Sequence, residues 1–326
     1  MKAVIAALAA NLVIAIAKFA AFLVTGSASM LSEAVHSVAD TANEGLLLIG
    51  QGRSRRGRTV EHPFGFGRER YFYAFIVAVM LFTVGAAFSV YDGVHRILNP
   101  GHLESPLINY IVLGLSAVAE GASLRTGIQE ANKVREGRSF FRFIRSTKAP
   151  DLVVVLLEDS AAVLGLLFAF LGVLLSQLTR NEQWDGAGSV GVGLLLACAA
   201  LVVGRETKSL LIGESASDQV SAQIVSAIEG GDGRFRLIHL RTSHIGPDSL
   251  LVTGKIGAPA EMTVRDLAAD INAAEARIRA AVPVAETIYL EPDIYQPHLA
   301  NPQDPSVEIV QRTTDRRSRL RTPRRP

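Results

Sequence analysis

Residues 31–50 read LSEAVHSVADTANEGLLLIG, an apolar stretch that nevertheless contains a histidine and several acidic side chains. An ionised group in hydrocarbon is costly, so ionisable residues inside a membrane segment indicate a functional site. His36 and Asp40 are four residues apart, which on a helix places both side chains on one face, about one turn apart. An imidazole nitrogen and a carboxylate oxygen at this spacing can bind one metal ion. The alternative is a buried His–Asp hydrogen bond between helices, and the membrane setting favours the metal.

Six apolar segments are long enough to cross a bilayer, whose hydrocarbon core of about 30 Å requires about 20 helical residues. The chain has 326 residues, 49% of them hydrophobic, and its mean hydropathy is +0.28. We therefore predict an all-α transmembrane bundle of six helices within residues 1–212. The predicted helices cover residues 3–25, 31–50, 71–93, 107–130, 150–177 and 186–210.

Basic residues are distributed unevenly over the connecting loops. Residues 51–70 and 131–148 each contain six lysines or arginines, whereas the alternate loops contain one at most. Because lysine and arginine mark cytoplasmic loops, we predict a multi-pass protein with cytoplasmic N- and C-termini, in the inner membrane if the source is bacterial. The single cysteine, Cys198, excludes an intramolecular disulfide framework and a multi-cysteine zinc site.

The composition changes after Gly213, and residues 213–296 are predicted to form a cytoplasmic α/β domain of ferredoxin-like type. Thr263 can cap a helix that Pro283 ends. The domain is small for an independent core, which favours a homodimer. Residues 297–326 are predicted to be a disordered basic tail. The expected αββαβ order comprises a helix at 216–229, strands at 235–242 and 250–256, a helix from 263, and a strand at 287–291.

Two neighbouring carboxylates, Glu158 and Asp159, occur in the fifth apolar segment. Consecutive helical residues point about 100° apart, so the two are not expected to face one site squarely. Asp159 together with the pair in the second segment would provide three protein ligands, and Glu158 or water could supply a fourth. A water-filled cavity or an interhelical hydrogen bond is the alternative role for Glu158.

Further polar residues extend this pattern. Asn43, Glu44 and Asp151 are candidates for the lining of a cation pathway, although Glu44 could equally lie at the membrane–water boundary. Glu120 in the fourth segment is deep enough to need a partner, which the sequence does not identify. His62 begins the sequence HPFGFGR, a candidate loop site for which a tight structured turn is the preferred interpretation.

These motifs, in this order, resemble the cation diffusion facilitator family of metal–proton antiporters. The resemblance covers about residues 8–296 and rests on Gly26-Ser27-Ala28, the His36-x-x-x-Asp40 pair, the His62 loop, the acidic fifth helix and the αββαβ domain. Within the family, the sequences at 36–43, 156–163 and 289–293 are most similar to the branch of animal zinc transporter nine.

The resemblance implies a homodimer with a transport site between the second and fifth helices, in which His36, Asp40 and Asp159 match the family's ligands. Three positions depart from the family pattern. Val155 occupies the position of the family's usual fourth ligand. Either Glu158 takes over that role, or the site has only three protein ligands. Phe66 and Tyr289 stand where many members have histidine, which predicts a weak or absent second metal site in the loop and in the soluble domain.

We predict that the protein exports a divalent metal by alternating access, driven by protons. Zn²⁺ is the expected substrate, and Fe²⁺, Co²⁺ and Mn²⁺ accept the same ligands. The alternative is a membrane-embedded metal sensor or scaffold without transport turnover, and a channel would lack proton coupling. The sequence contains no nucleophile–base arrangement, Walker loop or dinucleotide fingerprint, so an enzyme is not expected. The expected partners are the lipid bilayer, protons and a second copy of the chain, with no nucleic acid.

Overall fold

The computed structural model describes residues 2–25, 28–99, 106–135, 137, 139–140, 143–144, 147–181, 183–231 and 234–294. Within these ranges, the side chains of residues 2–7, 9–10, 21–22, 24–25, 28–36 and 106–109 are outside the description. The predicted basic tail at 297–326 also lies outside it. The chain divides into two compact units, with the boundary between Leu211 and Ile212.

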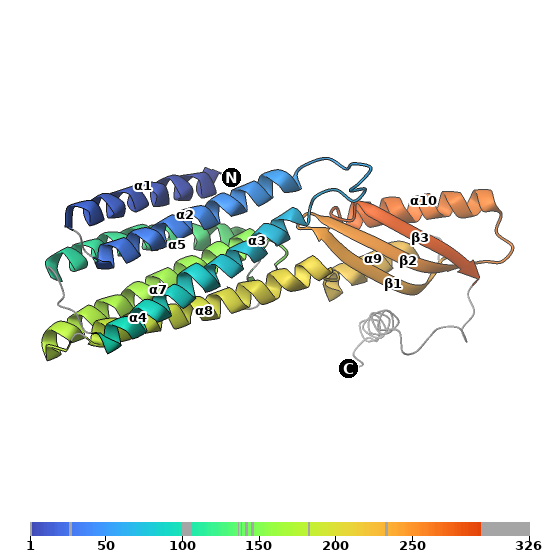
Figure 1. Ribbon diagram of the computed structural model, residues 1–326. Helices are drawn as coiled ribbons and strands as arrows, with labels where there is room; N and C mark the ends of the chain where they lie inside the picture. Colours follow the sequence, from blue (N-terminus) through green and yellow to red (C-terminus); the bar gives the residue numbers. More distant parts are fainter. Residues whose placement is uncertain are drawn as a thin grey trace, which may run out of the picture. The chain divides into compact units, whose positions relative to one another are not determined.

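The first unit consists of long helices that lie side by side (Figure 1). Helices occur over each of the six predicted segments, and the third segment changes from α- to π-helix and back along its length. The elements are α1 (Lys2–Thr25), α2 (Ala28–Ser54), α3 (Glu69–Met80), the π-helix η1 (Leu81–Ala87), α4 (Phe88–Leu98), α5 (Pro106–Val134), α7 (Pro150–Thr179) and α8 (Gln183–Ile212).

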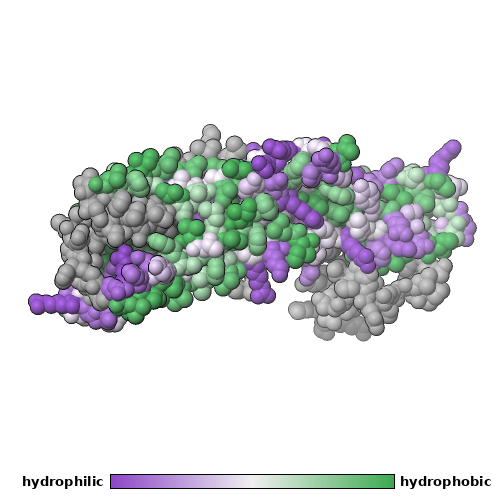
Figure 2. All heavy atoms as spheres, in the orientation of Figure 1, coloured by the Kyte–Doolittle hydropathy of each residue, from purple (hydrophilic) through white to green (hydrophobic). Residues whose placement is uncertain are grey.

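Four stretches of the described residues are long and apolar enough to cross a membrane. They are Glu69–Leu98, Tyr110–Val134, Pro150–Thr179 and Gln183–Ile212, and a shorter apolar helix covers Asn11–Ala20. Large apolar side chains remain exposed on them, for example Leu115 at 68% and Leu201 at 63%. Hydrophobic atoms cover much of the visible face of this unit in Figure 2. Extended apolar surface of this kind marks contact with lipid or protein, so the unit is a membrane domain.

Glycines bring α8 very close to α4 and α7. A Cβ on Gly93 of α4 would lie 2.7 Å from the carbonyl oxygen of Gly186 in α8, and one on Gly188 would lie 2.9 Å from the carbonyl oxygen of Phe168 in α7. Helix backbones approach so closely in membranes only where the side chains are small. This packing holds α7, the helix with the paired carboxylates, against α8.

The second unit is a three-stranded sheet with two helices. It contains α9 (Asp218–Glu229), β1 (Arg236–Gly246), β2 (Ser249–Ala258), α10 (Val264–Ala281) and β3 (Thr287–Ile294), in the predicted αββαβ order. β1 and β2 pair antiparallel, and β2 and β3 pair parallel because α10 connects them as a crossover. Its core consists of fully buried side chains such as Ile224, Leu250, Val252, Ile256 and Ile278.

The sequence predicted the ends of most of these helices and strands to within a few residues. The backbone N–H of Asp266 donates to the hydroxyl of Thr263 at 3.2 Å, so the predicted cap of α10 is confirmed. The strands are longer than predicted, since β1 extends to Gly246 and β3 to Ile294. Pairing with β2 over this whole length explains the extension, because ladder hydrogen bonds depend on the neighbouring strand.

Candidate metal centre in the membrane domain

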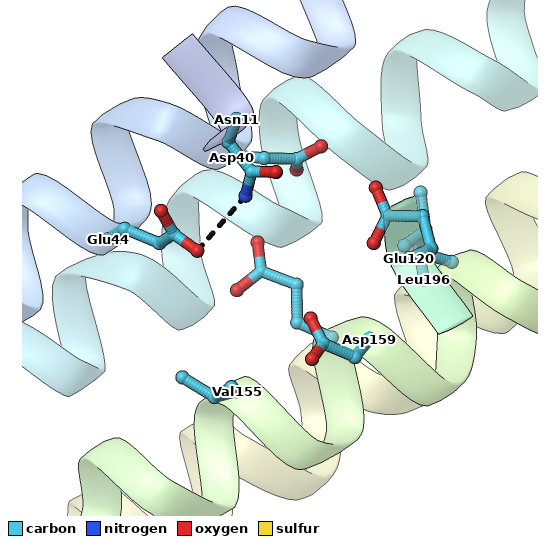
Figure 3. A pocket seen from close by; sticks show the side chains of 9 residues that line it. Asn11, Asp40, Glu44, Glu120, Val155, Asp159 and Leu196 are labelled. Carbon is cyan, nitrogen blue, oxygen red and sulfur yellow. Dashed lines mark hydrogen bonds between the residues drawn. The ribbon is translucent and has the colours of Figure 1, made fainter. Parts of the chain in front are cut away.

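A small enclosed pocket lies among α1, α2, α5, α7 and α8 (Figure 3). It offers about 10 Å³ to the centre of a water-sized sphere, which is room for about one water or one ion. Five of its nine lining residues are acidic, and Figure 3 shows the carboxyl groups of Asp40, Glu44 and Glu120 around its interior. The lining consists of Asn11, Asp40, Glu44, Glu120, Val155, Glu158, Asp159, Ala162 and Leu196.

Both carboxylates of α7 line this pocket, although neighbouring helical residues are not expected to face one site squarely. Val155, Glu158, Asp159 and Ala162 have the spacing i, i+3, i+4 and i+7, which defines a single helical face. Glu158 and Asp159 lie on either side of the centre line of that face. A local twist of α7 is therefore not needed to bring Glu158 to the pocket, and Val155 lines the same face without offering a ligand atom.

Each of these two carboxylates accepts a hydrogen bond from another helix. Asn43 Nδ2 of α2 donates to Glu158 Oε1 at 2.8 Å, and both side chains are buried. The interhelical hydrogen bond, which was the alternative role for Glu158, is present, and Asn43 is not among the residues that line the pocket. Ser123 Oγ of α5 donates to Asp159 Oδ2 at 2.8 Å. Such outer hydrogen bonds fix the orientation of groups that bind metals.

Sequence reasoning did not find the role of α5. Glu120 lines the pocket, and Ser123 is three residues further along the same helix. The i, i+3 spacing of two polar residues in an otherwise apolar segment was a usable signal, because such residues share a helix face. The sequence does not show which helix this face meets.

The second helix contributes Asp40 and Glu44 to the pocket. Asn11 Nδ2 of α1 donates to Glu44 Oε1 at 3.0 Å, so Glu44 belongs to the pocket and not to a solvated boundary. His36 lies one turn before Asp40 in α2, but its side chain is outside the described residues. Among the side chains that are described, no three His, Cys, Asp or Glu groups lie close enough together to hold a metal ion.

Asp151, predicted to line the pathway, is not among the residues of this pocket. It lies in the first turn of α7, where the Arg70 guanidinium of α3 donates to both of its carboxylate oxygens. The two side chains are 14% and 24% exposed. Asp151 thus joins the ends of two helices by a bidentate ion pair.

His62 lies in an exposed, tightly hydrogen-bonded loop. Its backbone N–H donates to Thr59 Oγ1 at 3.0 Å, its carbonyl oxygen accepts from Gly65, and its ring lies 4.5 Å from that of Phe66. Gly65 has a φ of 81°, which favours glycine. The interpretation as a structured turn is confirmed.

Comparison with known proteins identifies the family to which this chain belongs. Residues 4–212 match the cation efflux transmembrane domain, which is more than half of the chain. The protein therefore belongs to the cation efflux family, also called the cation diffusion facilitator family, as the sequence motifs predicted.

Similar proteins come from animals, plants and bacteria. The human proton-coupled zinc antiporter SLC30A9, mitochondrial, is 38% identical over 240 residues, which cover 73% of this chain and 42% of the human protein. Metal tolerance protein C4 of Arabidopsis thaliana is 31% identical over 267 residues, or 81% of this chain and 58% of the plant protein. The manganese efflux system protein MneP of Bacillus subtilis is 24% identical over 257 residues, or 77% of this chain and 81% of that protein. The chain thus spans less than half the length of the human relative, and the names of the human and bacterial relatives describe transporters, not enzymes.

Proposed function

We propose that this protein exports a divalent metal cation, with Zn²⁺ as its main substrate, in exchange for protons by alternating access. The observation that carries the proposal is that Asp40 from α2 and Glu158 and Asp159 from α7 line the same pocket of the membrane domain. Membership of the cation efflux family and similarity to a proton-coupled zinc antiporter and to a manganese efflux protein support it.

The proposed ligands are His36, Asp40, Asp159 and Glu158. His36 precedes Asp40 by one helical turn, so the two share a face of α2. Glu158 replaces the ligand that the family usually has at the position of Val155. One imidazole and three carboxylates suit Zn²⁺, and Fe²⁺, Co²⁺ and Mn²⁺ accept the same donors.

Proton exchange follows from the chemistry of these ligands. Carboxylate and imidazole groups bind a metal only when deprotonated, so protonation of the site releases the ion. Histidine titrates near neutral pH, and His36 is therefore the ligand that responds to a physiological pH difference. A proton gradient directed into the cytoplasm would drive the metal out.

The membrane arrangement is also part of the proposal. We infer that α1 and α2 cross the bilayer with the four apolar helices, giving six spans with both termini in the cytoplasm. The α/β unit would be a ferredoxin-like cytoplasmic domain that pairs with a second copy of the chain. Tyr289 is 59% exposed on β3, and such an apolar group on an open sheet suits a homodimer contact.

Zn²⁺ flux into sealed proteoliposomes with an imposed pH gradient tests the function. Asp40→Asn and Asp159→Asn should abolish flux, whereas Glu130→Gln, which changes an exposed carboxylate on α5 paired with Lys133, should not. Bound Zn²⁺ without flux in the wild type would support the sensor or scaffold instead. Undiminished flux in both aspartate variants would refute the site.

A further inference from the structure

Lys18 is a buried basic residue of α1 that the proposed transport mechanism does not use. Only 8% of it is exposed, and it lies seven residues, or about 10 Å, before the end of the helix at Thr25. A lysine that snorkels keeps its head group in water, which does not fit a residue buried this far from the helix end. A charged side chain inside a membrane segment otherwise faces the bundle interior and marks a functional site.

The burial pattern of α1 shows which way Lys18 faces. Between residues 11 and 20, the large apolar side chains Leu12, Val13, Ile16 and Phe19 are exposed. The partly or fully buried residues have the spacing i, i+3, i+4 and i+7 of one helical face, and they are Asn11, Ile14, Ala15 and Lys18. Because α1 packs chiefly against α2, and Asn11 donates to Glu44 of α2, Lys18 lies on the face that meets α2 (Figure 3).

The hairpin of α1 and α2 sets the depth of Lys18 relative to the pocket. Only two residues separate the helices, which lie side by side and antiparallel (Figure 1). Asn11 bonds to Glu44, so Lys18, seven positions later, lies level with Ser37, seven positions earlier on α2 and also buried. Asp40 is about 4 to 5 Å from this level along the helix axis. Since helical side chains lean toward the N-terminus, Lys18 and Asp40 lean toward each other.

The pocket contains more acidic groups than one metal ion can balance. Five of its lining residues are acidic, and it has room for about one ion, whose two charges leave part of the negative charge uncompensated. When the metal leaves, the repulsion between these carboxylates increases, and repulsion is strong where water is scarce. A fixed positive charge at the level of Asp40 reduces this repulsion. The same charge repels a metal ion that enters the pocket.

We propose that Lys18 is the tethered counter-cation of the transport site, whose ammonium group supplies positive charge beside Asp40 when the metal has left. The inference rests on the proposed function, because it concerns the return of the emptied carrier. The charge lowers the cost of reorienting an acidic pocket that holds no metal. It also weakens Zn²⁺ binding and so favours release. Lys18 acts through Asp40 and does not touch the metal, which makes it a positioning residue and not a ligand.

Equilibrium Zn²⁺ binding to the purified full chain in lipid nanodiscs separates this role from a structural one by the direction of the change. Lys18→Met removes the charge and should bind Zn²⁺ at least about tenfold more tightly, because a nearby unit charge no longer repels the ion. Damage to the packing of α1 would weaken binding instead. Lys18→Arg keeps the charge and should bind as the wild type does. Lys133→Met, which removes an exposed lysine of α5, is the matched control and should leave affinity unchanged.

Two transport modes in proteoliposomes test the return step. Net Zn²⁺ flux driven by a pH gradient requires the carrier to reorient without metal, whereas exchange of radioactive for unlabelled Zn²⁺ does not. Lys18→Met should lower the ratio of net flux to exchange by at least about tenfold. Lys18→Arg should restore the ratio of the wild type, and Lys133→Met should not alter it.

Zn²⁺ binding in Lys18→Met that is unchanged or weaker than in the wild type would overturn the counter-cation. Equal losses of net flux and exchange would do the same. If Lys18→Met does not give a single species on size exclusion, Lys18→Gln, which is neutral but polar, replaces it with the same expected results. Failure of the proposed function is seen separately, as flux that survives Asp40→Asn, whatever Lys18→Met does to Zn²⁺ affinity.

Discussion

Replacing Gly93 by alanine tests the close packing that holds the membrane helices together. The new methyl group would lie 2.7 Å from both the carbonyl oxygen of Gly186 and the backbone nitrogen of Val190 in α8. These are backbone atoms, which cannot rotate away as a side chain can. The helices α4 and α8 must therefore separate by several tenths of an ångström.

The expected magnitude follows from two opposing effects. Overpacking of a close contact costs about 1–3 kcal/mol, and the rigid backbone contact places Gly93→Ala in the upper part of that range. Alanine in a helix offsets about 1 kcal/mol of this. The free energy of unfolding should thus fall by about 1–2 kcal/mol.

Gly114 in α5 provides the matched control, because a Cβ there would meet nothing within 4 Å. Gly114→Ala should leave stability unchanged or raise it by up to about 1 kcal/mol. Unfolding of the full chain, titrated with denaturing detergent in mixed micelles and followed by circular dichroism, measures both variants. A Gly93→Ala protein as stable as Gly114→Ala would refute the reasoning about the α4–α8 contact.

Three further outcomes are expected. Ser123→Ala removes the hydroxyl that fixes the Asp159 carboxylate and should lower Zn²⁺ affinity by about 10- to 100-fold, measured by equilibrium binding. A double-mutant cycle with Arg70→Gln and Asp151→Asn should give a coupling energy of about 0.5–3 kcal/mol in detergent unfolding, and zero coupling would contradict the bidentate ion pair. In the α/β unit, the hydrogen bond from Lys255 lowers the pKa of Asp293 below its ordinary value. The stabilisation by this pair is therefore present above the ordinary pKa of the carboxyl and is lost as the pH falls through the lowered pKa. Lys255→Met should raise the NMR titration midpoint of Asp293 toward its ordinary value, and the hydrogen bond from the Ile294 backbone N–H should keep part of the lowering.

Short-range features of this protein could be predicted from its sequence because they depend on contacts between near neighbours. The spacing of His36 and Asp40 required only helical geometry. The hydroxyl of Thr263 and the N–H that it caps are three residues apart, so the start of α10 was correctly predicted. The long apolar segments were predicted as helices, since in lipid a helix satisfies its own backbone hydrogen bonds.

The composition of the pocket was decided by tertiary structure. Helical geometry alone predicted that Glu158 and Asp159 would not face one site squarely, but the pocket spans the whole face between Val155 and Ala162 and both residues line it. Asn43 and Glu158 are 115 residues apart, and Arg70 and Asp151 are 81 apart. Such pairs depend on how each helix is rotated about its axis against its neighbours. The sequence by itself thus determined which residues share a helix face, whereas the packing of the helices determined which faces meet and which carboxylates surround one ion-sized space.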